Sequence, residues 1–79
     1  MVDRSSRAEV RNPVLDLPAT QRLIALPAPI RAHLREVLLD MHRDAADRAQ
    51  TCWRKHKAPM ALYWKAVSVY AGHFARTLR

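Results

Sequence analysis

The sequence contains little of what β-rich, disulfide-bonded and membrane-spanning proteins require. It has one glycine and one cysteine in 79 residues, and aromatic residues make up 6% of the chain. Because glycine is the usual residue at the positive φ angles of hairpin turns, a single glycine argues against a fold rich in strands. Cys52 has no second cysteine to pair with, so no internal disulfide can form. No apolar run reaches the roughly 18 residues that a membrane span needs.

Acidic residues are also scarce. Seven Asp and Glu stand against 14 Lys and Arg, which gives a formal net charge of +7. This excess predicts an anionic partner, such as nucleic acid, an acidic protein face or a membrane surface, and argues against an acidic mimic of DNA. Because acids are mixed among the bases of the first long helix, we expect no membrane partner. The first residues are polar and lack the apolar segment of a secretion signal, so we expect a soluble cytoplasmic protein.

The length and the apolar content together predict one small domain. Apolar residues make up 49% of the chain, too many for an intrinsically disordered protein. A chain this short buries only a marginal core by itself. We expect a flexible polar tail over residues 1–12 and a single helical domain over 13–79. A homodimer would supply the missing burial.

Apolar residues recur at helical spacing along most of the chain, which predicts an all-α fold. A short helix is expected over 19–26, with Asn12 or Asp16 as candidate caps and Pro27 beyond its end. Two long amphipathic helices are expected over 29–57 and 59–78. The first would bury Ile30, Leu34, Val37, Leu38, Met41, Ala45, Ala49 and Cys52, and the second Met60, Tyr63, Trp64, Val67, Tyr70, Ala71, Phe74 and Leu78.

Two arrangements of the long helices are compatible with the sequence around Pro59. Proline is favourable in a first helical turn and costly in a helix interior, so we prefer a tight turn that makes an αα-hairpin. Ala58 is a poor cap, which leaves open a single helix that is kinked at Pro59 and buries its apolar stripe by dimerisation.

Several apolar residues fall outside the expected core stripes. Leu62, Val69 and His73 lie on the far side of the second long helix, and Leu39 and Trp53 lie off the stripe of the first. The short helix could cover this strip as the third member of a bundle. Alternatively, the strip is an exposed interface for self-association or for a target protein.

A cationic cluster is expected where the two long helices meet. Arg54, Lys55, Lys57 and Lys65 would form one patch if the chain turns at Pro59, with Trp53 beside it. Cations and flat rings together suit phosphate binding and base stacking. The simpler interpretation is that these cations stabilise a helix end through its dipole and free carbonyl groups.

The sequence offers little for catalysis or metal binding. Cys52 and His56 stand four residues apart, but two ligands do not make a structural zinc site and no third group orients them as nucleophile and base. Asp40 and Asp44 pair by spacing with Arg43 and Arg48, which predicts solvated ion pairs. We expect no enzyme activity, no catalytic residue, no metal and no cofactor.

Two segments resemble small proteins of phage and plasmid mobile elements, among them anti-CRISPR proteins. These segments are Asn12-Pro-Val-Leu-Asp-Leu-Pro18 and Lys57-Ala-Pro-Met-Ala-Leu-Tyr-Trp-Lys-Ala-Val67. The resemblance implies a stoichiometric inhibitor of a type I CRISPR-Cas complex that acts by binding protein. The alternative, from another class, is a small basic protein that binds DNA or RNA.

Overall fold

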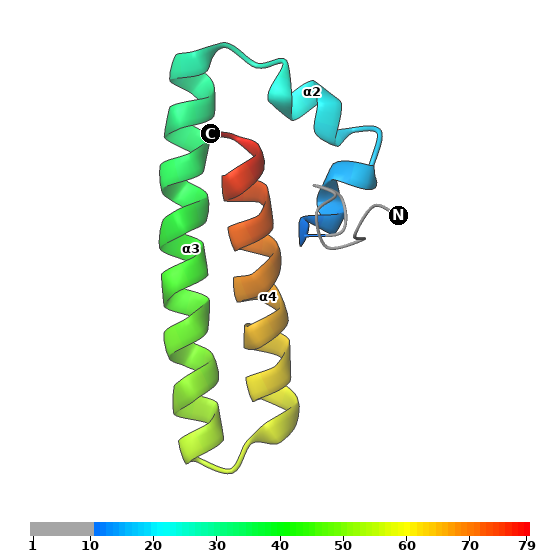
Figure 1. The fold of residues 1–79 in the computed structure, drawn as a ribbon. Coiled ribbons are helices and arrows are strands. Elements are labelled where there is room, and N and C mark those ends of the chain that lie inside the picture. Colours follow the sequence, from blue (N-terminus) through cyan, green and yellow to red (C-terminus); the bar gives the residue numbers. More distant parts are fainter. Residues whose placement is uncertain (1–10) are drawn as a thin grey trace.

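The computed structural model describes residues 11–79, and the predictions made for residues 1–10 lie outside the described residues. A short 3₁₀ helix (Pro13–Asp16) and α2 (Thr20–Ile24) precede two long helices, α3 (Ala28–Arg54) and α4 (Ala58–Thr77). Helices α3 and α4 form an antiparallel hairpin, and the 3₁₀ helix and α2 lie on the side of α4 away from α3 (Figure 1). The described residues contain no strand, and the expected all-α fold is confirmed.

The turn between the long helices closes just before Pro59, which rules out the single kinked helix. The Lys57 amide donates to the Cys52 carbonyl at 2.8 Å, and the His56 amide donates to the Trp53 carbonyl at 3.1 Å. These two bonds make a Schellman ending for α3, in which the residue after the C-cap adopts a left-handed conformation. His56 occupies that position with φ 58°. Pro59 then lies within the first turn of α4, where its missing N–H costs nothing.

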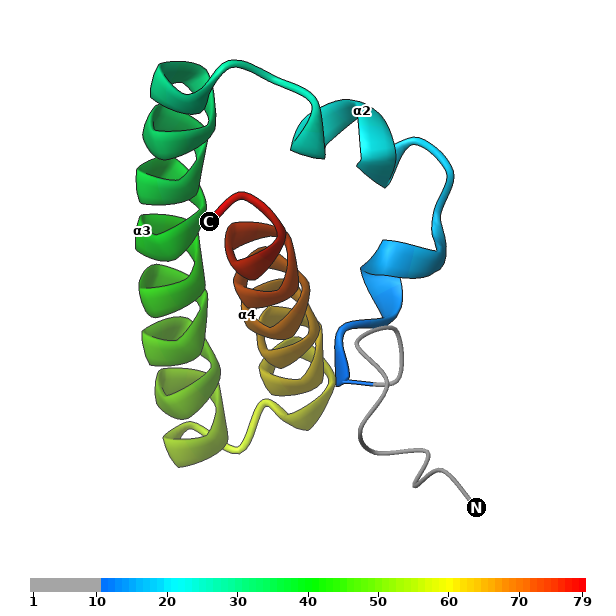
Figure 2. The same cartoon turned by 45° about the horizontal axis from the view of Figure 1, so that its top comes forward.

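Small residues form the seam between α3 and α4. The buried residues of the two long helices, which we call the small-residue seam, are Ala45 and Ala49 of α3 and Ala61, Ser68, Ala71, Gly72 and Ala75 of α4. Small side chains let two helix backbones approach closely along their length. The two orientations of Figures 1 and 2 show the helices side by side throughout α4.

This seam corrects the core expected from hydrophobic spacing. Six large residues predicted to be buried are exposed instead, namely Ile30, Val37, Met41, Met60, Tyr63 and Tyr70. Leu34, Leu38, Trp64, Val67 and Phe74 are half-buried, and Leu78 is buried. The reason is geometric, because the alanine-rich sides of the helices face each other and turn the neighbouring large residues outward.

A polar contact fixes the register of the two helices at mid-length. Nδ1 of His42 donates to the Ser68 carbonyl at 2.7 Å, and the Ser68 hydroxyl donates to the His42 carbonyl at 3.0 Å. The His42 ring lies over Gly72, where an added Cβ would stand 3.2 Å from Nδ1. The single glycine of the chain thus provides space for an imidazole rather than a turn.

The N-terminal segment is attached to the C-terminal half of α4. Nδ2 of Asn12 donates to the His73 carbonyl at 2.9 Å, and the buried Thr20 hydroxyl donates to the Val14 carbonyl. Asn12 was expected to belong to the polar tail, but it is buried, so the folded part includes it. Neither predicted cap makes a side-chain capping bond: Asn12 bonds to α4 instead, and α2 begins after Ala19.

Candidate binding surface

A groove runs along one side of the hairpin, between α3 and α4. Its volume is about 260 Å³, and it is lined by His42, Ala46, Ala49, Gln50, Trp53, Lys65, Ser68 and Val69. Of these eight residues, Lys65 is the one lysine or arginine, and none is acidic. His42 and Ser68 both line the groove, so the polar contact that joins the two helices also shapes it.

Most residues of the predicted apolar strip lie beside this groove. Trp53 and Val69 line it and are 45% and 43% exposed, and Leu62, one helical turn before Lys65, is 58% exposed. Leu39 and His73 are half-buried. The short helix α2 leaves Leu62 and Val69 uncovered, because the N-terminal segment packs on the outer side of α4 near its C-terminal end. We call the side of the hairpin that carries this groove the groove face.

The four cations predicted to form one patch are divided between the turn and the groove. Arg54 ends α3, Lys55 follows it, and Lys57 precedes the first residue of α4. All three are exposed and lie within the hairpin turn. Lys65 is eight residues further along α4, about 12 Å from Lys57 at 1.5 Å per residue, and lies in the groove beside Trp53.

Charge is segregated between the two long helices. Within residues 11–79, four of the five acidic residues lie on α3 between Glu36 and Asp47, and α4 has none. Arg43 pairs with Asp40 at 3.1 Å and Arg48 with Asp44 at 3.4 Å, as their spacing predicts. Both pairs are solvent-exposed, and pairs of this kind contribute at most about 1 kcal/mol each. The exposed cations of α4 therefore face solvent without acidic neighbours on their own helix.

A histidine with an altered proton affinity lies on the far part of α4. The pKa of His73 is lowered, first because burial removes water from the ring and second because the Arg76 guanidinium is close. Arg76 approaches Nδ1 of His73 to 2.7 Å, and since arginine can only donate, this nitrogen is the acceptor. His73 is thus held in its neutral form with the ring proton on Nε2.

Cys52 and His56 lie in different surroundings. Cys52 is half-buried in α3, whereas His56 is exposed in the turn that follows. Across residues 11–79, no group of three His, Cys, Asp or Glu side chains is arranged to hold a metal ion. In the same residues, no helix combines the length and the apolar character needed to cross a membrane.

Sequence reasoning missed two surfaces. One is an apolar face on the side of the hairpin opposite the groove, where Met41, Arg48, Trp64 and Val67 line a shallow hollow of about 250 Å³. The Arg48 guanidinium lies 5.1 Å from the centre of the Trp64 ring. The other is a group of arginines at the end of the molecule away from the hairpin turn. Their spacing in the chain gives no signal, because they come from three separate segments.

Comparisons of the chain with known protein families, with curated proteins and with solved structures find no match.

Proposed function

We propose that this protein is a non-catalytic binding protein whose groove face attaches to an acidic surface of a protein partner. The observation that carries the proposal is the composition of this face, where exposed Trp53, Leu62 and Val69 surround Lys65 and no acidic residue lines the groove. Binding surfaces typically concentrate their energy in a few aromatic and aliphatic anchors. Cations around such anchors accelerate association with an acidic partner.

The specific form that we propose is stoichiometric inhibition of a type I CRISPR-Cas surveillance complex. It follows from the resemblance of two segments to anti-CRISPR proteins, and the groove face supports it by offering a surface rather than a catalytic site. The second of these segments, Lys57 to Val67, contributes both Leu62 and Lys65 to that surface. The inhibitor would occupy an acidic patch of a protein subunit.

Binding to a purified, assembled type I surveillance complex tests this form. The protein should co-elute with the complex in a fixed ratio after nuclease treatment. Leu62→Glu with Val69→Glu should abolish co-elution, whereas the matched variant Met60→Glu, on the opposite side of α4, should leave it unchanged. Absence of co-elution for the unmodified protein, or equal loss with Met60→Glu, would contradict the proposal.

A second candidate function is nucleic-acid binding through the same groove. The observation that favours it is the half-exposed Trp53 ring beside Lys65 and Gln50, because a flat ring next to a cation suits an unstacked base and its phosphate. In this case nuclease treatment would remove the captured partner. Trp53→Ala would then weaken binding to a single strand more than binding to a duplex, since only unpaired bases can stack on the ring.

A further inference from the structure

Five arginines gather at the end of the molecule opposite the hairpin turn. We call this group the arginine end: Arg11 precedes the 3₁₀ helix, Arg31 and Arg35 lie in the first turns of α3, and Arg76 and Arg79 lie at the end of α4. Arg31, Arg35 and Arg79 line one hollow of about 320 Å³, and Arg11, Arg76 and Arg79 line a second of about 520 Å³. Arg79 belongs to both, so the two hollows form one continuous cationic surface.

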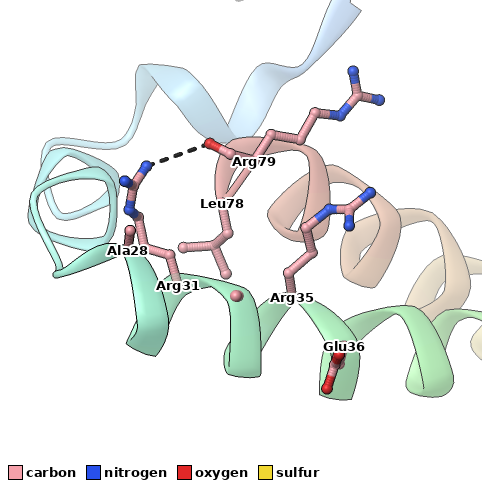
Figure 3. A pocket seen from close by; sticks show the side chains of 7 residues that line it. Ala28, Arg31, Arg35, Glu36, Leu78 and Arg79 are labelled. Atoms are coloured by element: carbon pink, nitrogen blue, oxygen red, sulfur yellow. Dashed lines mark hydrogen bonds between the residues drawn. The ribbon is translucent and has the colours of Figure 1, made fainter.

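Within residues 11–79, no side-chain carboxylate pairs with these arginines. In residues 11–79 the ion pairs join Arg43 to Asp40 and Arg48 to Asp44, both in the middle of α3. Glu36 lines the first hollow, but Figure 3 shows its carboxylate pointing away from the guanidinium groups of Arg31, Arg35 and Arg79. The cluster therefore places five arginine side chains together without a paired acidic side chain from the described part of the chain.

Two guanidinium donors of the cluster lack a hydrogen-bond partner among the residues that the structure describes. Nε of Arg31 and Nε of Arg35 are shielded from water and make no hydrogen bond. Arg31 uses one terminal nitrogen to donate to the Arg79 carbonyl at 3.3 Å, which ties the start of α3 to the end of α4. Figure 3 shows the Arg35 and Arg79 side chains extending to the same side of Leu78, with their guanidinium groups directed outward. A polyanion on this side would meet both of them.

We propose that the arginine end is a binding site for the phosphodiester backbone of nucleic acid. Guanidinium groups bind phosphate oxygens through paired N–H donors, and arginine is favoured over lysine where that geometry is needed. A backbone supplies several phosphates at regular spacing, which matches a cluster spread over two adjoining hollows better than one compact anion does. Among residues 11–79, no aromatic side chain lines either hollow, so the site would recognise charge and spacing without base identity.

This site is separate from the proposed protein-binding surface and does not rest on it. At 1.5 Å per residue, Arg35 and Arg54 on α3 are about 28 Å apart, and none of the five arginines lines the groove. One molecule could thus contact a protein with its groove face and a nucleic-acid backbone with its arginine end.

Two double variants with the same net charge test the site. Arg35→Gln with Arg79→Gln removes two charges from the arginine end, and Lys55→Gln with Lys57→Gln removes two from the hairpin turn. Each lowers the formal charge from +7 to +5. Fluorescence anisotropy of a short labelled DNA duplex of mixed sequence is measured with each protein between about 50 and 200 mM salt.

We expect the arginine variant to bind the duplex about tenfold more weakly and to lose nearly two from the slope of log affinity against log salt. The lysine variant should stay within about twofold of the unmodified protein in affinity, because its charges act only at long range. Equal weakening by both variants would show an effect of net charge alone and overturn the site. Weakening by the lysine variant only would overturn it in favour of the hairpin turn.

Two further measurements make the outcome independent of variant folding. In the unmodified protein, the guanidinium N–H resonances of Arg35 and Arg79 should shift on addition of the duplex, and their failure to shift while other resonances move would overturn the site. A polyglutamate peptide of equal charge should bind at least tenfold more weakly than the duplex. Equal binding of the peptide would assign the arginine end to an acidic protein instead, and no binding of the duplex by the unmodified protein would refute the proposal.

Discussion

In most helical proteins the large apolar side chains are buried between the helices. In this hairpin the small-residue seam is buried, and many large apolar side chains lie on the outer faces of the same two helices. The seam consists of alanines with Ser68 and Gly72, whereas Val37, Met41, Leu62, Tyr63 and Tyr70 are more than two-fifths exposed. Close approach of two helices needs small residues between them, and here it leaves the large residues exposed. In this hairpin, the small residues are buried between the helices, and many of the large apolar residues lie at the surface.

Enlarging a side chain in the seam should have the largest effect on folding. Ala61 is fully buried, and Ala61→Leu inserts three carbons where the backbones are in close contact, so the free energy of unfolding should fall by about 2–3 kcal/mol. For a domain of this size, the midpoint of thermal unfolding followed by circular dichroism should drop by roughly 10–20 °C.

The matched control is Ala66→Leu, the same change at an exposed position of α4. It should alter the unfolding free energy by less than about 0.5 kcal/mol. A similar drop in both variants would mean that the two positions do not differ in packing and would remove the basis of the comparison.

The outer faces differ from one another in their capacity to hold a second copy of the chain. The expected homodimer fits the apolar face better than the groove strip, because two groove faces would bring Lys65 near its own copy with no acid to offset it. The apolar face carries both signs, since Asp44 and Arg48 border Met41 there. A two-fold axis could place Asp44 of one copy beside Arg48 of the other.

We expect Val37→Glu with Met41→Glu to convert a dimer into a monomer in light scattering at tens of micromolar. Leu62→Glu with Val69→Glu, which adds the same charge to the groove strip, should leave the dimer intact. A monomeric mass for the unmodified protein would contradict the dimer, and dissociation by the groove variant would return the interface to the strip that the sequence suggested.

The sequence was sufficient to predict where the long helices lie in the chain, but not which side of each helix faces the other. Pro27 and Pro59, with the spacing of apolar residues between them, predicted both long helices and the turn, and the expected pairs of Asp40 and Asp44 are present. The spacing of apolar residues predicted that Met41 is buried, because such a pattern takes account of side-chain polarity but not of how closely two helix backbones pack. The alanines of the small-residue seam, which determine which sides of the helices face each other, contribute weakly to a pattern based on hydrophobicity. The arginine end was missed because only the fold brings its three segments together.

The polar contact within the seam should have an intermediate effect. Ser68→Ala removes the hydroxyl that donates to the His42 carbonyl, and the free energy of unfolding should fall by about 1 kcal/mol in urea denaturation. Thr51→Ala deletes a comparable hydroxyl, bonded to the Asp47 carbonyl in an exposed part of α3, and should change stability by less than about 0.5 kcal/mol. An equal loss of unfolding free energy in the two variants would show that burial does not increase the contribution of the hydrogen bond to stability.

The turn that joins the helices should be improved by glycine. His56 adopts a left-handed conformation that is strained for a residue with a Cβ, so His56→Gly should raise the free energy of unfolding by about 0.5–1 kcal/mol. Lys55, its neighbour, has φ −91°, so Lys55→Gly should give no such gain. Stabilisation by both changes, or by neither, would contradict the role of the backbone angle.

Titration of His73 should give the smallest effect, and its sign is fixed by the lowered pKa. Burial and then Arg76 hold the pKa of the folded histidine below 6.5, whereas the unfolded chain titrates at its ordinary value. As the pH falls below about 6.5, the unfolded state binds a proton that the folded state does not, so stability declines until the folded pKa is passed. His73→Gln keeps an acceptor for Arg76 but cannot titrate in this range. The free energy of unfolding of this variant should therefore fall less as the pH drops below about 6.5. Urea unfolding of both proteins at about pH 7.5 and pH 5 measures the difference, and identical pH dependence in the two proteins would show that His73 is as readily protonated in the folded state as in the unfolded one.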